Sequence, residues 1–280
     1  MTYTGTYRGD VMFHFDPRTS TVTPIGVPIP EHGTPSLASL GTNGLVYGEA
    51  TDPNPRNPRN HDTGAFFVYD TKTQTVVFRD DNPDHSLFRN ILLDNKGGAF
   101  VAGENGRLLV YQPGHHSLRD DGVQLPGGGP LRASTRPAPD GAVYAVTQSP
   151  DGRAPEMFFA LEPDASIRTL GPARGYTTSM ALSADGSRFY YVPGAHGDSA
   201  DQGTPVIEVD TKTGAQRVVT KLNPLATTTL GLSLAGSYNV ALDTARNRLF
   251  VGLNAGKTPA DPWGEVVLAI IDLGTQTAHR

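Results

Sequence analysis

One pattern recurs six times along this chain of 280 residues, and it limits the possible folds more than any other feature. An apolar run ends in Asp, Glu or Gln, a short polar turn follows, and a second extended run begins. The polar residues that end the runs are 42 to 62 residues apart, about 51 on average. A repeat of this length is typical of one small antiparallel sheet. The six end residues are Asp16, Asp70, Gln112, Glu162, Asp210 and Asp272.

Alternation of apolar and polar residues predicts the other strands of each period. Three similar hairpins are expected over 90–102, 179–192 and 239–251, each with a short polar turn between two extended runs. No segment longer than a turn has the 3.6-residue period of a helix between helix caps. The sequence therefore predicts an all-β fold, a β-propeller with six blade repeats of about four antiparallel strands, labelled A (innermost) to D (outermost).

The count of strands is incomplete at both ends of the repeat array. Residues 2–7 read as a strand B with no strand A before it, and residues 276–280 as a short strand D. We expect a single propeller domain over 1–280, with an incomplete first blade and five further blades. Their predicted bounds are 1–26, and then about 27–82, 83–125, 126–173, 174–231 and 232–280. The pattern fits either a six-bladed closure or a seven-bladed propeller that has lost its N-terminal part. We favour the second, because an unpaired inner position exposes a strand edge.

Composition and missing motifs exclude several classes of function. Lys and Arg number 23 against 28 Asp and Glu, so the net charge of −5 argues against a nucleic-acid binder. The absence of Cys excludes disulfides, thiolate catalysis, iron–sulfur clusters and cysteine-ligated zinc. No apolar run approaches the roughly 20 residues of a membrane span, and no signal peptide is visible, which leaves the compartment open. The sequence also lacks a GxSxG elbow, a P-loop and a GxGxxG motif after a strand.

The turns resemble those of bacterial propeller proteins of the YVTN and WD-repeat-like group. The likeness lies in the segments 68–73, 182–186 and 209–214, which contain Asp-Thr-Lys-Thr and Ser-Ala-Asp-Gly turns. This resemblance implies the propeller architecture over nearly the whole chain, and it implies no activity.

A second resemblance, to the gluconolactonase and regucalcin propellers, has chemical content. Those proteins place metal-binding Asn or Asp side chains at the start of inner strands, in a context similar to Asn90 and Asn239. The matching positions in other blades are Ser134 and Ser179, while the glutamate ligand of that group has no clear counterpart. The resemblance therefore implies a contact role for Asn90 and Asn239 alone.

The connections between strands differ in length, and this difference predicts a functional face. The A–B and C–D turns are minimal, whereas the B–C loops 51–64, 147–156, 193–203 and 254–264 are long. Loops longer than a connection requires tend to carry function on a rigid scaffold. In a propeller the B–C loops and the D–A connections lie on the same face, so we expect the functional residues there.

Acidic residues and histidines are paired on two of the D–A connections. Glu31 and His32 repeat as Asp84 and His85 at equivalent points of adjacent blades, and His196 lies in a B–C loop. Such residues suit one divalent metal ion, or general acid–base catalysis by the three histidines near neutral pH. The alternative interpretation is that each acid caps a turn while the imidazole packs at the surface.

Further residues predicted on the same face suit a small ligand. Small polar residues at the start of four inner strands would surround the axis and hold water, an ion or a sugar hydroxyl, or would only satisfy facing backbone groups. Aromatic residues with a polar tip are a usual platform for a sugar ring, and an arginine could hold an anion with two hydrogen bonds. The polar residues are Asn90, Ser134, Ser179 and Asn239, the aromatic residues are Tyr176, Tyr238 and Trp263, and the arginine is Arg132.

The function predicted from these features is small-molecule binding at the loop-rich face, by a metal-assisted lyase or hydrolase acting on a carbohydrate or lactone. Two alternatives stay open. A non-catalytic propeller would dock a protein partner with its long loops, and a structural segment would belong to a larger protein. No nucleic acid or membrane is expected as a partner.

Overall fold

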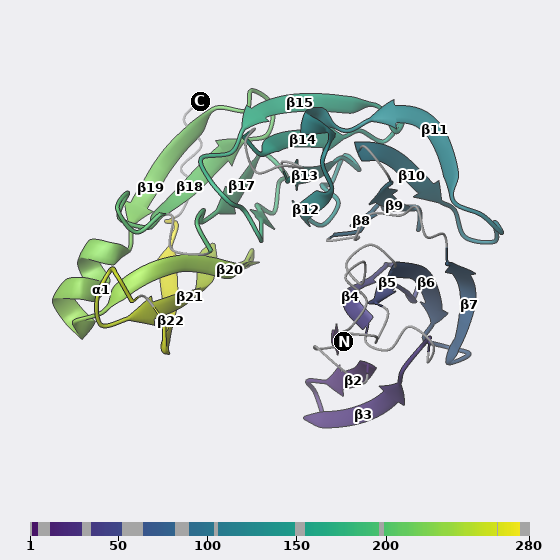
Figure 1. The fold of residues 1–280 in the computed structure, drawn as a ribbon, viewed down its shortest axis with the longest axis horizontal. Coiled ribbons are helices and arrows are strands. Elements are labelled where there is room, and N and C mark those ends of the chain that lie inside the picture. The colour runs from purple at the N-terminus through teal and green to yellow at the C-terminus, as the bar shows by residue number, and fades with distance from the viewer. Residues whose placement is uncertain are drawn as a thin grey trace. The chain divides into compact units, whose positions relative to one another are not determined.

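The fold of this protein is all-β. The computed structural model describes residues 2–4, 12–29, 35–51, 64–81, 90–103, 106–148, 155–195, 199–261 and 263–274. Strands make up 53% of the chain and helices 5%. In the described residues the strands form six antiparallel sheets, four with four strands and two with three (Figure 1). These are the sheets of a β-propeller, and they confirm the predicted fold class.

Contacts divide the chain into two compact units, and the first unit comprises residues 1–131. It contains three sheets, ordered β1-β2-β3, β4-β5-β6-β7 and β11-β10-β9-β8. The first sheet has three described strands. The strands are β1 (Thr2–Thr4), β2 (Met12–Asp16), β3 (Thr21–Gly26), β4 (Pro35–Leu40), β5 (Leu45–Thr51), β6 (Gly64–Asp70), β7 (Thr75–Asp80), β8 (Leu92–Leu93), β9 (Ala99–Ala102), β10 (Arg107–Tyr111) and β11 (Arg119–Gln124), followed by the short helix η3 (Pro126–Gly128).

The second unit comprises residues 132–280 and also contains three sheets. Their strand orders are β12-β13-β14-β15, β16-β17-β18-β19 and β20-β21-β22. The expected short strand at 276–280 lies outside the described residues. The elements are β12 (Leu131–Ser134), β13 (Val143–Thr147), β14 (Met157–Leu161), β15 (Ile167–Pro172), β16 (Ala181–Leu182), β17 (Arg188–Tyr191), β18 (Pro205–Asp210), β19 (Gln216–Lys221), α1 (Asn223–Leu230), β20 (Ser233–Asp243), β21 (Arg248–Gly256) and β22 (Glu265–Asp272).

Two of the repeated acids, Asp70 and Asp210, form the turns between the third and fourth strands of their sheets. The Asp70 carboxylate accepts the backbone N–H of Lys72 at 2.7 Å, and Asp210 accepts that of Lys212 at 3.1 Å. Hydrogen bonds of this kind let Asp close a tight turn with its own side chain. They stabilise the charged carboxylate, so the pKa of Asp70 lies below its usual range. At Asp70 and Asp210 the periodic acid of the sequence is therefore a turn former.

The core of each unit lies between neighbouring sheets. In the second unit, Ile207 and Val209 on one face of β18 pack in a cluster with Phe158 and Phe189. Val206, on the opposite face of β18, packs in another cluster with Leu249 of the following sheet. Burial on both faces explains why the apolar runs of the third strands are nearly continuous.

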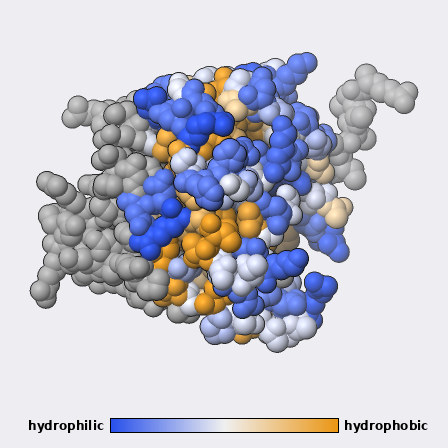
Figure 2. All heavy atoms as spheres, turned by 90° about the vertical axis from the view of Figure 1, so that its right-hand side faces the viewer, coloured by the Kyte–Doolittle hydropathy of each residue, from blue (hydrophilic) through white to orange (hydrophobic). Residues whose placement is uncertain are grey.

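The outer strands β3, β7, β11, β15 and β19 are mostly exposed or only partly buried. Along β7, Phe78 is buried, while its neighbours Val77 and Arg79 are exposed. On the side of the molecule shown in Figure 2, hydrophobic residues accordingly occur in groups among hydrophilic ones. These outer strands therefore form the solvent boundary of their sheets.

The helix α1 contradicts the expectation that no segment longer than a turn would be helical. Pro224 lies in its first turn, and Gly231 ends it in the left-handed conformation with φ +66°. This arrangement of Pro and Gly is a common helix boundary. The interior contains three consecutive threonines, whose branched side chains disfavour a helix and hide its period. No helix in the described parts of the chain is long and apolar enough to cross a membrane.

Candidate functional site

The residues predicted to hold a metal ion or act as acid–base groups lie outside the described residues. They are Glu31, His32, Asp84, His85 and His196. Among the residues that the structure does describe, no group of three His, Asp or Glu side chains is placed to hold a metal ion. The metal site and the acid–base roles therefore stay predictions, and no reaction step is derived from them.

Three of the predicted ligand-binding residues lie together in the second unit. Arg132 of β12 donates a hydrogen bond from Nε to the Tyr176 hydroxyl at 2.8 Å, and its guanidinium carbon lies 5.0 Å from the centre of the Tyr176 ring. Tyr238 of β20 is close enough for both groups to influence the pKa of its own hydroxyl. Arg132 and Tyr176 are half-buried and Tyr238 is exposed, so part of each side chain is accessible to solvent.

Partial burial is the main cause that raises the pKa of Tyr238. The nearby Tyr176 raises the pKa further, and the positive charge of Arg132 opposes both effects. A free tyrosine already titrates near pH 10. The Tyr238 hydroxyl is therefore protonated at neutral pH and able to donate a hydrogen bond.

The segment that carries Tyr176 is fixed on one side by the loops of neighbouring strands. Its carbonyl accepts the N–H of Gly194, from the β17–β18 connection, at 2.8 Å. The next residue, Thr177, donates its N–H to Oε2 of the buried Glu156 at 2.8 Å. Glu156 immediately precedes β14, so one segment between β15 and β16 is in contact with two B–C connections. Within the second unit, a D–A connection therefore contacts two B–C connections, the two kinds of connection that we expect on the same face.

Hydroxyl groups fix the same segment to β20 on its other side. Thr178 donates to the carbonyl of Ser237 at 2.8 Å. Ser179 accepts the N–H of Val240 at 3.0 Å, and its hydroxyl also lies 3.3 Å from the Val240 carbonyl. Ser179 therefore satisfies backbone groups, which is the alternative role considered for the small polar residues.

An irregularity in β20 determines the position of Tyr238. Ser237 pairs with Leu253 and Asn239 with Gly252, so Tyr238 is the extra residue of a β-bulge. The Ser237 hydroxyl stabilises this bulge by donating towards the carbonyls of Asn239 and Gly252, at 2.9 and 2.8 Å. Bulges commonly redirect a side chain beside a functional site.

Two glycines allow the β17–β18 connection to touch β20. A Cβ on Gly236 would lie 1.8 Å from the carbonyl oxygen of Gly194, and Gly236 itself has φ +143°. Gly194 has φ +83°, and a Cβ on it would lie 2.5 Å from the Cβ of Ser199. Only glycine permits this approach. Because Gly194 also binds the Tyr176 carbonyl, this backbone contact connects the supports of the two tyrosines.

The structure corrects the expected positions of the small polar residues. Ser134 is the last residue of β12 and Asn239 lies within β20, so neither begins an inner strand. The reason is that both strands begin earlier than the hairpin pattern indicates. Asn90 and Ser179 each precede a two-residue strand, β8 and β16. Asn90 belongs to the first unit, so only Ser134, Ser179 and Asn239 share a unit with Tyr176.

Two further predicted residues are exposed. Asn239 points away from the buried face of β20, and Trp263 lies just before β22 with 45% of its surface accessible. No described contact joins Trp263 to Arg132, so its binding role stays a prediction.

Sequence reasoning missed the supporting residues. Glu156, Ser237, Gly194 and Gly236 have no motif around them, and each acts on backbone groups that are distant in the chain. The one available signal was the pair of glycines in a long loop and in a strand, where a glycine often marks a close backbone approach.

Comparison with known proteins gives the fold and no family. No family model matches the chain, and no curated protein matches its sequence. A protein from Bacteroides uniformis, provisionally named a 6-phosphogluconolactonase, is 15% identical with a TM-score of 0.61, covering 97% of this chain and 76% of that one. Oligogalacturonate lyase in complex with manganese is 12% identical with a TM-score of 0.62, covering 95% and 72%. The calcium-binding protein regucalcin from Agrobacterium tumefaciens is 14% identical with a TM-score of 0.50, covering 82% and 74%.

These likenesses establish that the chain shares the fold of enzymatic and metal-binding propellers. The resemblance to regucalcin expected from the sequence is supported at this level. The YVTN and WD-repeat likeness has no support beyond the sequence itself. At identities of 12–15% a shared fold does not carry over a function.

Proposed function

We propose that the protein binds a small carbohydrate or lactone at Arg132, Tyr176 and Tyr238, and acts on it as a hydrolase or lyase. One observation carries the proposal. An arginine and two tyrosines from three separate segments converge, and hydrogen bonds from the Gly194 N–H and the Thr178 hydroxyl fix the segment that carries Tyr176. Convergent polar groups on a rigid base are the common form of a small-molecule site.

The chemistry of the three side chains suits a sugar-derived ligand. The guanidinium group and the tyrosine hydroxyls offer hydrogen-bond donors to ring, hydroxyl and carbonyl oxygens. A tyrosine ring covers the apolar face of a sugar, while its hydroxyl stays at the polar rim. Solved propellers of similar fold are named as acting on a lactone and on an oligogalacturonate, which supports this substrate class.

Acid–base catalysis is assigned in this proposal to His32, His85 and His196. Glu31 and Asp84 would join them if a divalent ion takes part, since imidazole and carboxylate groups are common metal ligands. This part rests on the sequence alone and has its own test. Elemental analysis should find a stoichiometric divalent metal that is lost in His85→Ala, and a metal-free wild-type protein would contradict it.

The binding part is tested by titration calorimetry with an aldonolactone and a short oligouronate. We expect saturable binding of one of them by the wild-type protein, and at least tenfold weaker binding by Arg132→Ala. The matched control is Arg136→Ala, because Arg136 is exposed and four residues away. No binding of either ligand, or equal loss in both variants, would contradict the proposal. The first of these results would favour the non-catalytic alternatives.

A further inference from the structure

The guanidinium group of Arg132 is held in one orientation by Tyr176. Its Nε donates to the Tyr176 hydroxyl at 2.8 Å, and its central carbon lies 5.0 Å from the centre of the same ring. Two contacts with one side chain leave the guanidinium little freedom to turn. A planar group of donors that is already oriented loses less entropy when it binds a ligand.

The contacts with Tyr176 do not neutralise the positive charge of Arg132. Other arginines of the second unit contact carboxylates, such as Arg168 with Glu162 at 2.8 Å and Arg217 with Glu208 at 2.7 Å. Those ion pairs join neighbouring parts of their own sheets. A tyrosine, in contrast, is uncharged at neutral pH. Tyr176 therefore orients the guanidinium and leaves its charge in place.

The remaining geometry of the guanidinium suits a carboxylate. Because Nε donates to Tyr176, the edge formed by Nη1 and Nη2 is the one that can meet a ligand with two parallel N–H groups. Two parallel donors match the two oxygens of a carboxylate, and such charge-assisted hydrogen bonds are about twice as strong as neutral ones. The protonated hydroxyl of the nearby Tyr238 can donate a further hydrogen bond to the same ligand.

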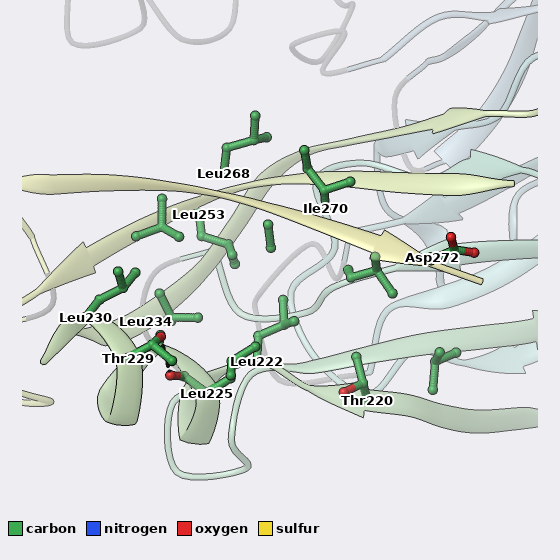
Figure 3. A pocket seen from close by; sticks show the side chains of 15 residues that line it. Thr220, Leu222, Leu225, Thr229, Leu230, Leu234, Leu253, Leu268, Ile270 and Asp272 are labelled. Carbon is green, nitrogen blue, oxygen red and sulfur yellow. Dashed lines mark hydrogen bonds between the residues drawn. The ribbon is translucent and has the colours of Figure 1, made fainter. Parts of the chain in front are cut away.

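A groove elsewhere in the second unit lacks such a positive charge. It has a volume of about 550 Å³ and lies between β19, α1 and β22. Figure 3 shows Leu225 and Leu230 of α1 on one side of this groove, and Leu268 and Ile270 of β22 on the other. Among the described residues that line it none is basic, and the charged one is an acid, Asp272. This groove is therefore unsuited to an acidic ligand.

We infer, on the basis of the proposed function, that the ligand bound at Arg132, Tyr176 and Tyr238 is an acidic sugar whose carboxylate meets the guanidinium group. This narrows the substrate class from carbohydrates and lactones in general to uronates and aldonates. Both have a carboxylate on a polyhydroxylated carbon chain. Hydrogen bonds to a charged group contribute more than those to neutral hydroxyls, so the carboxylate should dominate the affinity.

Matched acidic and neutral ligands test the inference by titration calorimetry. Trigalacturonate is compared with its methyl ester, and gluconate with glucitol, so that each pair differs mainly in the carboxylate. We expect the wild-type protein to bind at least one acid tenfold or more tightly than its neutral partner. The pair that shows this preference identifies a uronate or an aldonate. Added salt should weaken binding of that acid and leave its neutral partner unaffected, because salt screens charges.

Variants of Arg132 locate the preference for the acid. Arg132→Gln should bind the acid and its neutral partner equally, whereas Arg132→Lys keeps the charge without the two parallel donors and should retain part of the preference. The matched control is Arg136→Gln, because Arg136 is exposed and four residues away. It should keep the full preference. Equal circular dichroism spectra would show that the variants are folded.

Three results would overturn the inference, and they differ in what they say about the proposed function. Equal binding of acidic and neutral ligands by the wild-type protein would overturn the inference alone, since a neutral carbohydrate still binds. A preference for the acid that persists in Arg132→Gln would place the carboxylate at another group. Failure of all four ligands to bind would contradict both the inference and the proposed function.

Discussion

Glu156 illustrates how a single buried side chain supports the candidate site. Its carboxylate accepts the Thr177 N–H beside Tyr176, in a position where water has little access. A buried N–H without an acceptor costs about 1–3 kcal/mol. Glu156 therefore contributes both to stability and to the position of Tyr176.

Two replacements of Glu156 should separate the effect of its hydrogen bond to Thr177 from the effect of its charge. Glu156→Ala removes the acceptor, and we expect the free energy of unfolding to fall by about 1–3 kcal/mol. Glu156→Gln keeps an acceptor oxygen and should lose less. Urea denaturation at pH 7 measures both values, and equal losses in the two variants would contradict the role given to the acceptor.

Residues with a chemical signature were more predictable than those that support them. Arg132, Tyr176 and Tyr238 are predictable from the sequence, because each is a residue type that suits a ligand and lies in or beside an inner strand of the repeat. Glu156 and Ser237 were not found, because their partners are backbone atoms whose nearness only the folded chain reveals. Asn239 was placed at a strand start, and it lies within a longer strand instead.

At the scale of elements, the contact between β20 and the β17–β18 connection is the most constrained feature of the site. Two backbones meet at Gly236 and Gly194 with no space for a side chain. Tyr238 and the Tyr176 carbonyl both depend on the elements that meet there. A change at this point should therefore affect stability and ligand binding together.

Gly236→Ala tests this contact. The new methyl group would overlap the Gly194 carbonyl, so we expect a loss of about 3 kcal/mol or more in the free energy of unfolding. Gly264→Ala is the matched control, because Gly264 also has a positive φ, +100°, with no atom within 4 Å of the added group. It should lose only the cost of backbone strain, about 1–2 kcal/mol. Thermal and urea denaturation measure both variants. If Gly236→Ala lost no more stability than Gly264→Ala, the contact between Gly236 and Gly194 would not be tight.

Strands were predictable from the sequence because their apolar runs and turn acids repeat with the sheet. The turn at Asp210, for example, is formed by the acid that marks the repeat. The helix α1 was not predictable, because Thr227, Thr228 and Thr229 interrupt its apolar pattern and Ala226 is the residue it buries. Tertiary contact rather than local preference stabilises such a short helix.

At the scale of the whole molecule, aspartates close the short turns of both units, and this predicts an acid-sensitive fold. Hydrogen bonds from Ser183 lower the pKa of Asp185, and those from Thr213 lower the pKa of Asp210. A carboxyl whose pKa is lowered on folding adds stability above its unfolded value of about 3.9. That stability is lost as the pH falls through the lower value of the folded state.

We therefore expect stability to be level above about pH 5 and to fall below about pH 4. The variant Asp185→Asn with Asp210→Asn keeps acceptor oxygens that do not titrate, so it should lose less stability between pH 6 and pH 3 than the wild-type protein. Urea denaturation at the two pH values measures the difference. The same loss of stability in both proteins would exclude these two carboxyls as the cause of the acid sensitivity.

The most direct test of the account is hydrogen–deuterium exchange with and without the ligand identified by calorimetry. If the B–C and D–A connections form the binding site, bound ligand should slow exchange together in the peptides that contain Arg132, Tyr176 and Tyr238. Exchange should remain unchanged at the turns closed by Asp70, Asp185 and Asp210. Protection at those turns, with none around Tyr176, would contradict the account.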